Sequence, residues 1–157
     1  MIENYIQPKC IKVSPDLILV KYYTNYKASL PWYQDLSVCK QVDNIDYVYD
    51  KQRLGNMYKF LSRNGECYYI KAMVDGKFRL IGDISLCNNE IGIAICKEQQ
   101  NKHYGRKATQ AIINRAKQIG IKEIKVEIYS FNIQSKKMFL ALGFTQIDEE
   151  HYILKNF

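Results

Sequence analysis

The stretch QNKHYGRKA, residues 100–108, combines residue types that bind phosphate groups. Lys102, Arg106 and Lys107 bring positive charge to a short segment, and Gly105 lets a ligand approach the backbone closely because it has no side chain. The segment stands between a short apolar run and a stretch with helical periodicity. The first turn of a helix has unpaired backbone N–H groups and a partial positive charge, so we expect this loop to hold phosphate oxygens.

A strand and a helix must position this loop. In residues 91–95 isoleucine alternates with Gly92 and Ala94, which predicts a strand with one nearly bare face. From Arg106 onward, apolar residues recur at helical spacing, which predicts an amphipathic helix. Gly120 predicts its C-terminal end. The apolar stripe of this helix consists of Ala108, Ala111, Ile112, Ala116 and Ile119.

The rest of the chain is patterned mainly as strands. Residues 67–74 and 78–86 flank Asp75-Gly76, a dipeptide that favours a tight hairpin turn. Asp50 is expected to cap a helix that ends near Gly65. The remaining predicted elements are an opening strand at 11–13 and 17–20, a strand at 124–128, a helix from Asn132 to Gly143 and short strands at 144–147 and 152–154. This order predicts a mixed α/β, or α+β, fold that contains a β-α-β unit.

Composition narrows the classes of protein. The 157 residues, 47% apolar and 25% charged, fit one compact domain. The N-terminus lacks the pattern of a signal peptide and no segment approaches the roughly 20 apolar residues of a membrane span, so we expect a cytoplasmic protein without a membrane partner. The five cysteines form no C-x-x-C pair, and we expect neither a disulfide framework nor a metal site. The net charge of +7 favours anionic partners, and charge alone does not distinguish RNA, an acidic membrane face and a phosphorylated cofactor.

Two motifs resemble those of the GNAT superfamily of acyl-CoA-dependent N-acetyltransferases. The pyrophosphate loop of that family reads Q/R-x-x-G-x-G/A; Gln100 matches its first position, Gly105 matches its last, and His103 replaces the first glycine. A second family feature is an Asn followed by a small residue, an aromatic residue and Gly-Phe. In this sequence, Asn132, Ser135, Phe139 and Gly143-Phe144 resemble this feature. The resemblance to the family extends over about residues 66–157.

The resemblance implies a fold and a cofactor. The fold would be a GNAT-like, mostly antiparallel sheet flanked by helices, in one N-acetyltransferase domain over 1–157, with acceptor-side helices and the first strand in 1–65 and an acyl-CoA-binding core in 66–157. Ile93 and Ile95 would pair their backbone with the pantetheine arm of acetyl-CoA. The other expected cofactor-binding residues are Gln100, Asn101, Lys102, His103, Tyr104, Gly105, Arg106, Lys107, Asn132, Ser135 and Phe139.

Direct acetyl transfer to an amine requires a base and no covalent nucleophile. By resemblance, Glu90 at the start of the fourth family strand is the first candidate and Asp83 the second; Glu127, His103 and His151 are weaker candidates. Many relatives have a tyrosine where Phe139 stands, and its hydroxyl protonates the departing thiolate. Here a water, a backbone amide, Tyr104 or Tyr129 would have to do so.

The acceptor would be a primary amine of a small molecule or a peptide. The family usually builds the acceptor pocket from the N-terminal segment, so Trp32 and Tyr33 are expected to form its wall and Asp35 to attract a cation. A homodimer is compatible with the sequence. The missing tyrosine hydroxyl keeps a non-catalytic acyl-CoA sensor as the alternative, and the net positive charge with 13 tyrosines motivates a less favoured nucleic-acid-binding module.

Overall fold

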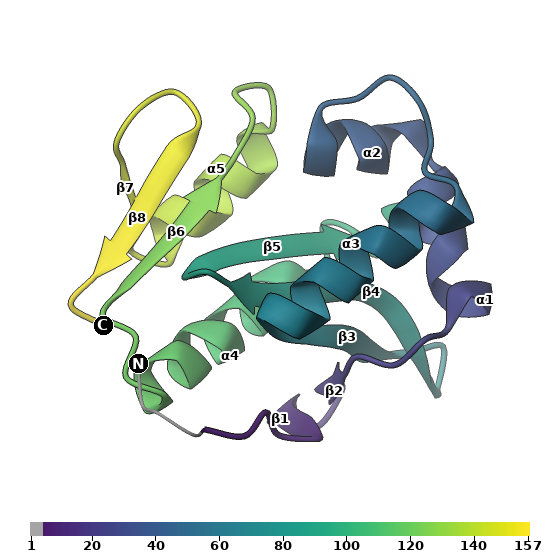
Figure 1. The fold of residues 1–157 in the computed structure, drawn as a ribbon, viewed down its shortest axis with the longest axis horizontal. Coiled ribbons are helices and arrows are strands. Elements are labelled where there is room, and N and C mark those ends of the chain that lie inside the picture. The colour runs from purple at the N-terminus through teal and green to yellow at the C-terminus, as the bar shows by residue number, and fades with distance from the viewer. Residues whose placement is uncertain (1–4) are drawn as a thin grey trace.

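The computed structural model of the protein describes residues 5–157, and an eight-stranded sheet is its central element (Figure 1). The strand order is β1-β2-β3-β4-β5-β6-β8-β7, and every neighbouring pair is antiparallel except β5 and β6, which are parallel. This confirms the predicted mixed fold. The strands are β1 Cys10–Ser14, β2 Leu17–Lys21, β3 Gly65–Val74, β4 Lys77–Cys87, β5 Glu90–Ile95, β6 Glu123–Glu127, β7 Thr145–Gln146 and β8 His151–Lys155.

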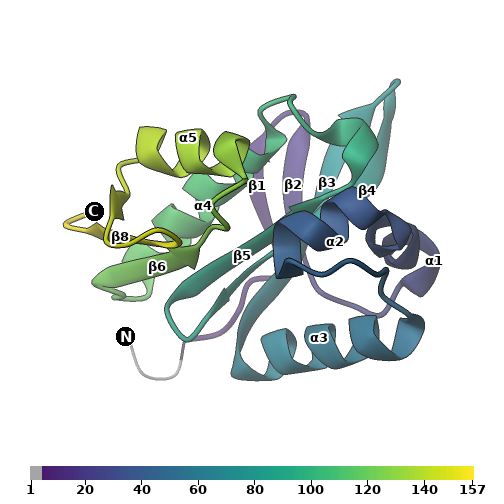
Figure 2. The same ribbon diagram turned by 90° about the horizontal axis from the view of Figure 1, so that it is seen from above.

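Helices cover both faces of the sheet. Figures 1 and 2 show α1 to α3 on one face and α4 and α5 on the other. Two short 3₁₀ helices, Leu30–Gln34 and Lys97–Gln99, lie between these elements. The α-helices are α1 Tyr26–Ser29, α2 Leu36–Asp43, α3 Lys51–Asn64, α4 Tyr104–Gln118 and α5 Ile133–Ala141.

Most of the predicted boundaries hold. Asp75 and Gly76 have φ angles of 49° and 79°, which confirms the tight turn between β3 and β4, and Asp50 caps α3 by accepting a hydrogen bond from the Arg53 N–H at 2.8 Å. The predicted opening strand is instead a hairpin of two strands, β1 and β2. The helix predicted from Arg106 begins two residues earlier because His103 takes the left-handed conformation and the helix starts directly after it.

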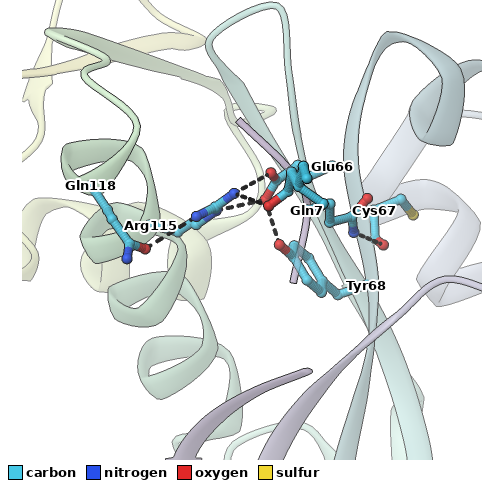
Figure 3. Close-up of polar contacts among 7 residues, drawn as sticks. Gln7, Glu66, Cys67, Tyr68, Arg115 and Gln118 are labelled. Atoms are coloured by element: carbon cyan, nitrogen blue, oxygen red, sulfur yellow. Dashed lines mark hydrogen bonds and ion pairs between the residues drawn. The ribbon is translucent and has the colours of Figure 1, made fainter. Parts of the chain in front are cut away.

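An ion pair buried between α4 and β3 anchors α4 to the sheet (Figure 3). Arg115 of α4 donates from Nε and Nη2 to the two carboxylate oxygens of Glu66, at 3.0 and 2.8 Å. The Tyr68 hydroxyl donates to the same carboxylate, and Arg115 Nη2 also donates to the Ile6 carbonyl. Because the two charged side chains are only 9% and 3% exposed, this bidentate contact orients the helix whose N-terminus carries the predicted phosphate loop.

The register of β4 and β5 determines which side chains share a face. Asp83 lies opposite Ala94, and Ser85 lies opposite Gly92. Side chains alternate along a strand, so these four residues and Glu90 lie on one face of the sheet. It is the face covered by α1 to α3, since Tyr58 of α3 contacts Asp83. In residues 5–157, no helix is both long and apolar enough to cross a membrane.

Candidate active site

A cavity of about 760 Å³ extends along β5, where β5 and β6 separate. Their pairing is limited to Glu90 opposite Lys125. Beyond that pair, the edge of β5 opens onto the cavity, and residues 91–95 line it together with parts of α2, α3 and α5. One end of the cavity is formed by residues 99–106, the predicted phosphate loop.

The open edge of β5 presents backbone groups to this cavity. The Cys96 N–H donates to the Ile81 carbonyl of β4 at 2.8 Å. Backbone groups alternate in direction along a strand. The N–H and C=O groups of Ile93 and Ile95 therefore point away from β4, toward the open edge. The Gln100 side chain confirms this direction, since its Nε2 donates to the Ile95 carbonyl at 2.9 Å. Ile93 therefore offers a donor and an acceptor to an extended ligand.

The loop between β5 and α4 has two left-handed residues, Asn101 with φ of 64° and His103 with φ of 66°. His103 thus adopts the conformation for which the family motif has a glycine; histidine is among the residue types enriched there. The first turn of α4 follows at once, and Tyr104, Gly105 and Arg106 line the cavity. The unpaired N–H groups of this turn are available to an anion.

Gly105 lies where a side chain would reduce the cavity. A Cβ atom placed on it would lie 3.4 Å from Met138 Sδ and 3.6 Å from Ile93 Cδ1. That is ordinary van der Waals contact, so a Cβ atom fits, whereas a longer side chain would compete with Met138 and Ile93 for this part of the cavity. The absence of a side chain therefore keeps the space between α4, α5 and the β5 edge open.

Gln100 and Lys107 have contacts that the sequence did not reveal. Gln100 forms two amide contacts with Gln41 of α2, at 3.0 and 3.3 Å, and so ties α2 to the start of the loop. Lys107 does not line the cavity but lies 3.9 Å from the Asp16 carboxylate. Lys102 and Arg106 are therefore the cationic loop side chains that reach the cavity.

The second motif lies on the opposite wall. Asn132 caps α5 by accepting a hydrogen bond from the Ser135 N–H, and both residues line the cavity. Phe139 also lines it and packs edge-on against Phe144, with ring centroids 5.1 Å apart. Tyr129 brings a phenol into the cavity, and burial, followed by the nearby Glu127 carboxylate, raises its pKa to about 12.

Asp83 is a buried carboxylate at the cavity, with 5% of its surface exposed. The hydroxyls of Tyr33 and Tyr58 both donate to its Oδ2 atom, at 2.7 and 2.8 Å. Burial raises the pKa of Asp83 to about 6, although the two hydrogen bonds favour the ionised form. Within residues 5–157, Oδ1 accepts no hydrogen bond and no cationic side chain pairs with this carboxylate.

Glu90 and Glu127 lie at the exposed mouth of the same cavity. Partial burial and then the Glu127 carboxylate raise the pKa of Glu90. His151 Nε2 lies 3.3 Å from Glu127 Oε2, and its Nδ1 lies 2.8 Å from Asp148 Oδ1. The hydrogen bond to Asp148 raises the pKa of His151, so the imidazole favours the protonated form and is a poor base.

Of the three residues predicted for the acceptor pocket, Tyr33 lines the cavity. Trp32 and Asp35 do not. Trp32 packs edge-on against Tyr69, with ring centroids 5.9 Å apart, and Asp35 caps α2 by accepting a hydrogen bond from the Val38 N–H. The contact between Tyr58 of α3 and Asp83 was not predicted from the sequence; a carboxylate within an otherwise apolar strand was the available signal, since such a group needs buried donors.

A known protein family matches most of this chain. The sequence profile of the acetyltransferase (GNAT) family matches residues 29–144, and the chain therefore belongs to this family. No curated protein matches the chain. GNAT acetyltransferases use acetyl-CoA as the acyl donor.

Solved structures share the fold at low sequence identity. An acetyltransferase (GNAT family) from Bacillus anthracis has a TM-score of 0.76 and 18% identity over 93% of this chain and 98% of its own. The Microcin C7 self immunity acetyltransferase MccE, solved with acetyl-CoA and AMP, has a TM-score of 0.76 and 16% identity over 96% and 98%. The acetyltransferase from Salmonella typhimurium that modifies the N-terminal serine of ribosomal protein L7/L12 has a TM-score of 0.70 and 16% identity over 94% and 99%.

Proposed function

We propose that this protein transfers an acetyl group from acetyl-CoA to a primary amine of a small molecule or peptide. The main supporting observation is that one cavity joins the first-turn amides of α4, the open edge of β5 and the buried Asp83 carboxylate. The MccE structure, solved with acetyl-CoA and AMP, and the acetyltransferase that modifies a protein N-terminal serine give the proposal further support.

The residues of the loop suit the cofactor. The N–H groups of Tyr104, Gly105 and Arg106 would hold pyrophosphate oxygens, with added attraction from Lys102 and Arg106. The Ile93 N–H and C=O would pair with the amides of the pantetheine arm as an added strand would. Bound acetyl-CoA supplies the activated acyl group; the chain orients it along β5 and leaves room beside Gly92 and Ala94.

Asp83 is the base that the geometry favours, with Glu90 as the alternative. Asp83 is fixed by two hydroxyls, and its pKa of about 6 suits proton transfer near neutral pH. Moving a proton from an α-amine with a pKa of about 7.8 to such a base costs roughly 2.5 kcal/mol, whereas a lysine-like amine costs roughly 6 kcal/mol. The first kind of amine is therefore the easier acceptor.

The departing thiolate has no hydroxyl at Phe139 to protonate it. If its pKa resembles that of cysteine, about 8.5, protonation of the thiolate at pH 7 is favourable by about 2 kcal/mol, and solvent can supply the proton. The Tyr129 phenol has its pKa raised to about 12 and is therefore a weaker acid than the thiol, so it can donate a hydrogen bond to the thiolate but is not the favoured proton source.

The Gly105→Glu variant tests the binding of acetyl-CoA. Acetyl-CoA should raise the Tm of the native protein, and the substitution should abolish this shift because it puts bulk and negative charge against the pyrophosphate. Gln110→Glu adds the same charge at an exposed position of α4 and serves as the matched control, which should keep the shift.

Thiol release from acetyl-CoA, measured across a panel of amines, tests the reaction. The proposal fails if saturating acetyl-CoA leaves the Tm of the native protein unchanged. A Tm shift without thiol release on any amine would instead favour the non-catalytic acyl-CoA sensor.

A further inference from the structure

We infer that the preferred acceptor is a primary amine next to an apolar group, with the amine at Asp83 and the apolar group against α2 and α3. This inference rests on the proposed function and specifies its substrate class. Two observations support it: one oxygen of the Asp83 carboxylate has no hydrogen-bond donor within residues 5–157, and apolar side chains line the same cavity.

The unpartnered oxygen is Asp83 Oδ1. The hydroxyls of Tyr33 and Tyr58 both contact Oδ2 and hold the carboxylate in one orientation. Oδ1 is left without a donor from residues 5–157, although the side chain is 95% buried and lines the cavity. Oδ1 is not a solvent-inaccessible atom and opens onto the cavity, where a ligand can donate a hydrogen bond to it; an ammonium group is such a donor, and its charge complements the carboxylate.

Several apolar side chains of α2 and α3 line the cavity that Asp83 also lines. Met57 and Leu61 lie on α3 four residues apart, on the helix that also carries Tyr58, and both line the cavity. Val42 of α2 and Tyr49 complete this wall. Tyr49 packs against Tyr33, with ring centroids 5.0 Å apart. An amine bound at Asp83 would therefore place its neighbouring carbon atoms against side chains that favour an apolar substituent.

Two other carboxylates that line the cavity, Asp43 and Glu127, already have partners, whereas Glu90 at the mouth has none among residues 5–157. Asp43 accepts hydrogen bonds from Arg53 Nη2 at 2.6 Å and from the Tyr49 hydroxyl at 2.9 Å. Glu127 lies beside His151. A second cationic group on the acceptor would have to compete with these contacts or remain at the mouth beside Glu90. The charges thus favour an acceptor with one cationic nitrogen over a diamine.

The acceptor panel tests this preference directly. Thiol release is measured with phenethylamine, with 1,4-diaminobutane and with two dipeptides whose N-terminal residue is leucine or aspartate. We expect kcat/KM for phenethylamine and the leucine dipeptide to exceed that for their polar counterparts at least tenfold. The ratio between phenethylamine and the leucine dipeptide distinguishes a small amine from a peptide N-terminus as the source of this chemistry.

A pair of variants on α3 tests the wall. Leu61→Lys should raise KM for the apolar amine at least tenfold and leave the acetyl-CoA-induced Tm shift intact, because Leu61 lines the cavity from α3 and is not part of the predicted phosphate loop. Phe60→Lys introduces the same charge at an exposed neighbouring position and should change neither quantity. Leu61→Met keeps the wall apolar and should raise KM far less than Leu61→Lys, so the two variants separate the effect of charge from the loss of the leucine side chain.

The outcomes separate the two proposals. Faster thiol release with the diamine, lost in Glu90→Gln, would overturn the apolar acceptor and leave the acetyltransferase function standing. An unchanged KM in a folded Leu61→Lys variant would do the same. Absence of both the Tm shift and thiol release with every amine would remove the function itself, and the acceptor assignment with it.

Discussion

Two buried carboxylates of this protein have tyrosine partners but different surroundings. Glu66 receives the Tyr68 hydroxyl and a bidentate Arg115 guanidinium, between β3 and α4 (Figure 3). Asp83 receives two tyrosine hydroxyls and no cation, and it lines the cavity. The first cluster is closed and compensated in charge, whereas the second has a free oxygen and a pKa raised to about 6.

The difference indicates what each carboxylate does. A buried charge with a matched counter-ion is expensive to break and does not readily exchange protons. A buried carboxylate with only neutral donors stays poised between its protonated and ionised forms, which suits proton transfer. The Glu66 cluster therefore fastens α4 and its loop to the sheet, and the Asp83 cluster is suited to chemistry.

Breaking the closed cluster should have the largest effect. Arg115→Met leaves the Glu66 carboxylate buried without a counter-ion and should lower the free energy of unfolding by about 3–5 kcal/mol. Urea denaturation measures this. Lys155→Met, which removes an exposed contact with Glu123, should cost less than about 1 kcal/mol. Equal costs for the two variants would show that the buried pair does not fasten α4.

Removing the open carboxylate should affect catalysis instead. Asp83→Asn should lower kcat/KM at least about 100-fold if Asp83 is the base, with the acetyl-CoA-induced Tm shift retained. Its folded-state pKa is raised, so ionisation opposes folding as pH rises through about 6. The free energy of unfolding at pH 8 should consequently not fall in the variant. Near-native kcat/KM would move the base to Glu90.

A smaller change separates the two clusters by pH dependence. The Tyr58 hydroxyl favours ionised Asp83, so Tyr58→Phe should raise the pKa of Asp83 and move the acid limb of kcat/KM from about pH 6 upward by about one unit. Tyr68→Phe removes the corresponding contact at Glu66 and should leave this limb in place. A profile that moves equally in both variants would reflect a general structural effect.

Local sequence patterns predicted much of the fold. The Asp75-Gly76 turn, the Asp50 cap and the alternation in residues 91–95 depend on neighbouring residues, and each appears in the structure as expected. Patterns failed where the backbone changes direction without a strong local signal. The opening strand proved to be a hairpin, and α4 begins at Tyr104 because His103 is left-handed.

The candidate site was predicted unevenly for the same reason. The predicted phosphate loop is continuous in sequence, so its residues could be named together, and seven of the eight from Gln100 to Lys107 line the cavity. The acceptor side is assembled from segments far apart in the chain. Tyr33 and Tyr58 lie 50 and 25 residues from Asp83, and no periodicity links them.

The sequence by itself determined the alternation of strands and helices and the loop that feeds the N-terminus of α4, because turns, caps and side-chain periodicity act between close neighbours. Only the tertiary structure decided which carboxylate is paired and which is free. Burial and counter-ions are properties of packing between β3, β4, α3 and α4, and they separate Glu66 from Asp83 although both are acidic residues in buried strands.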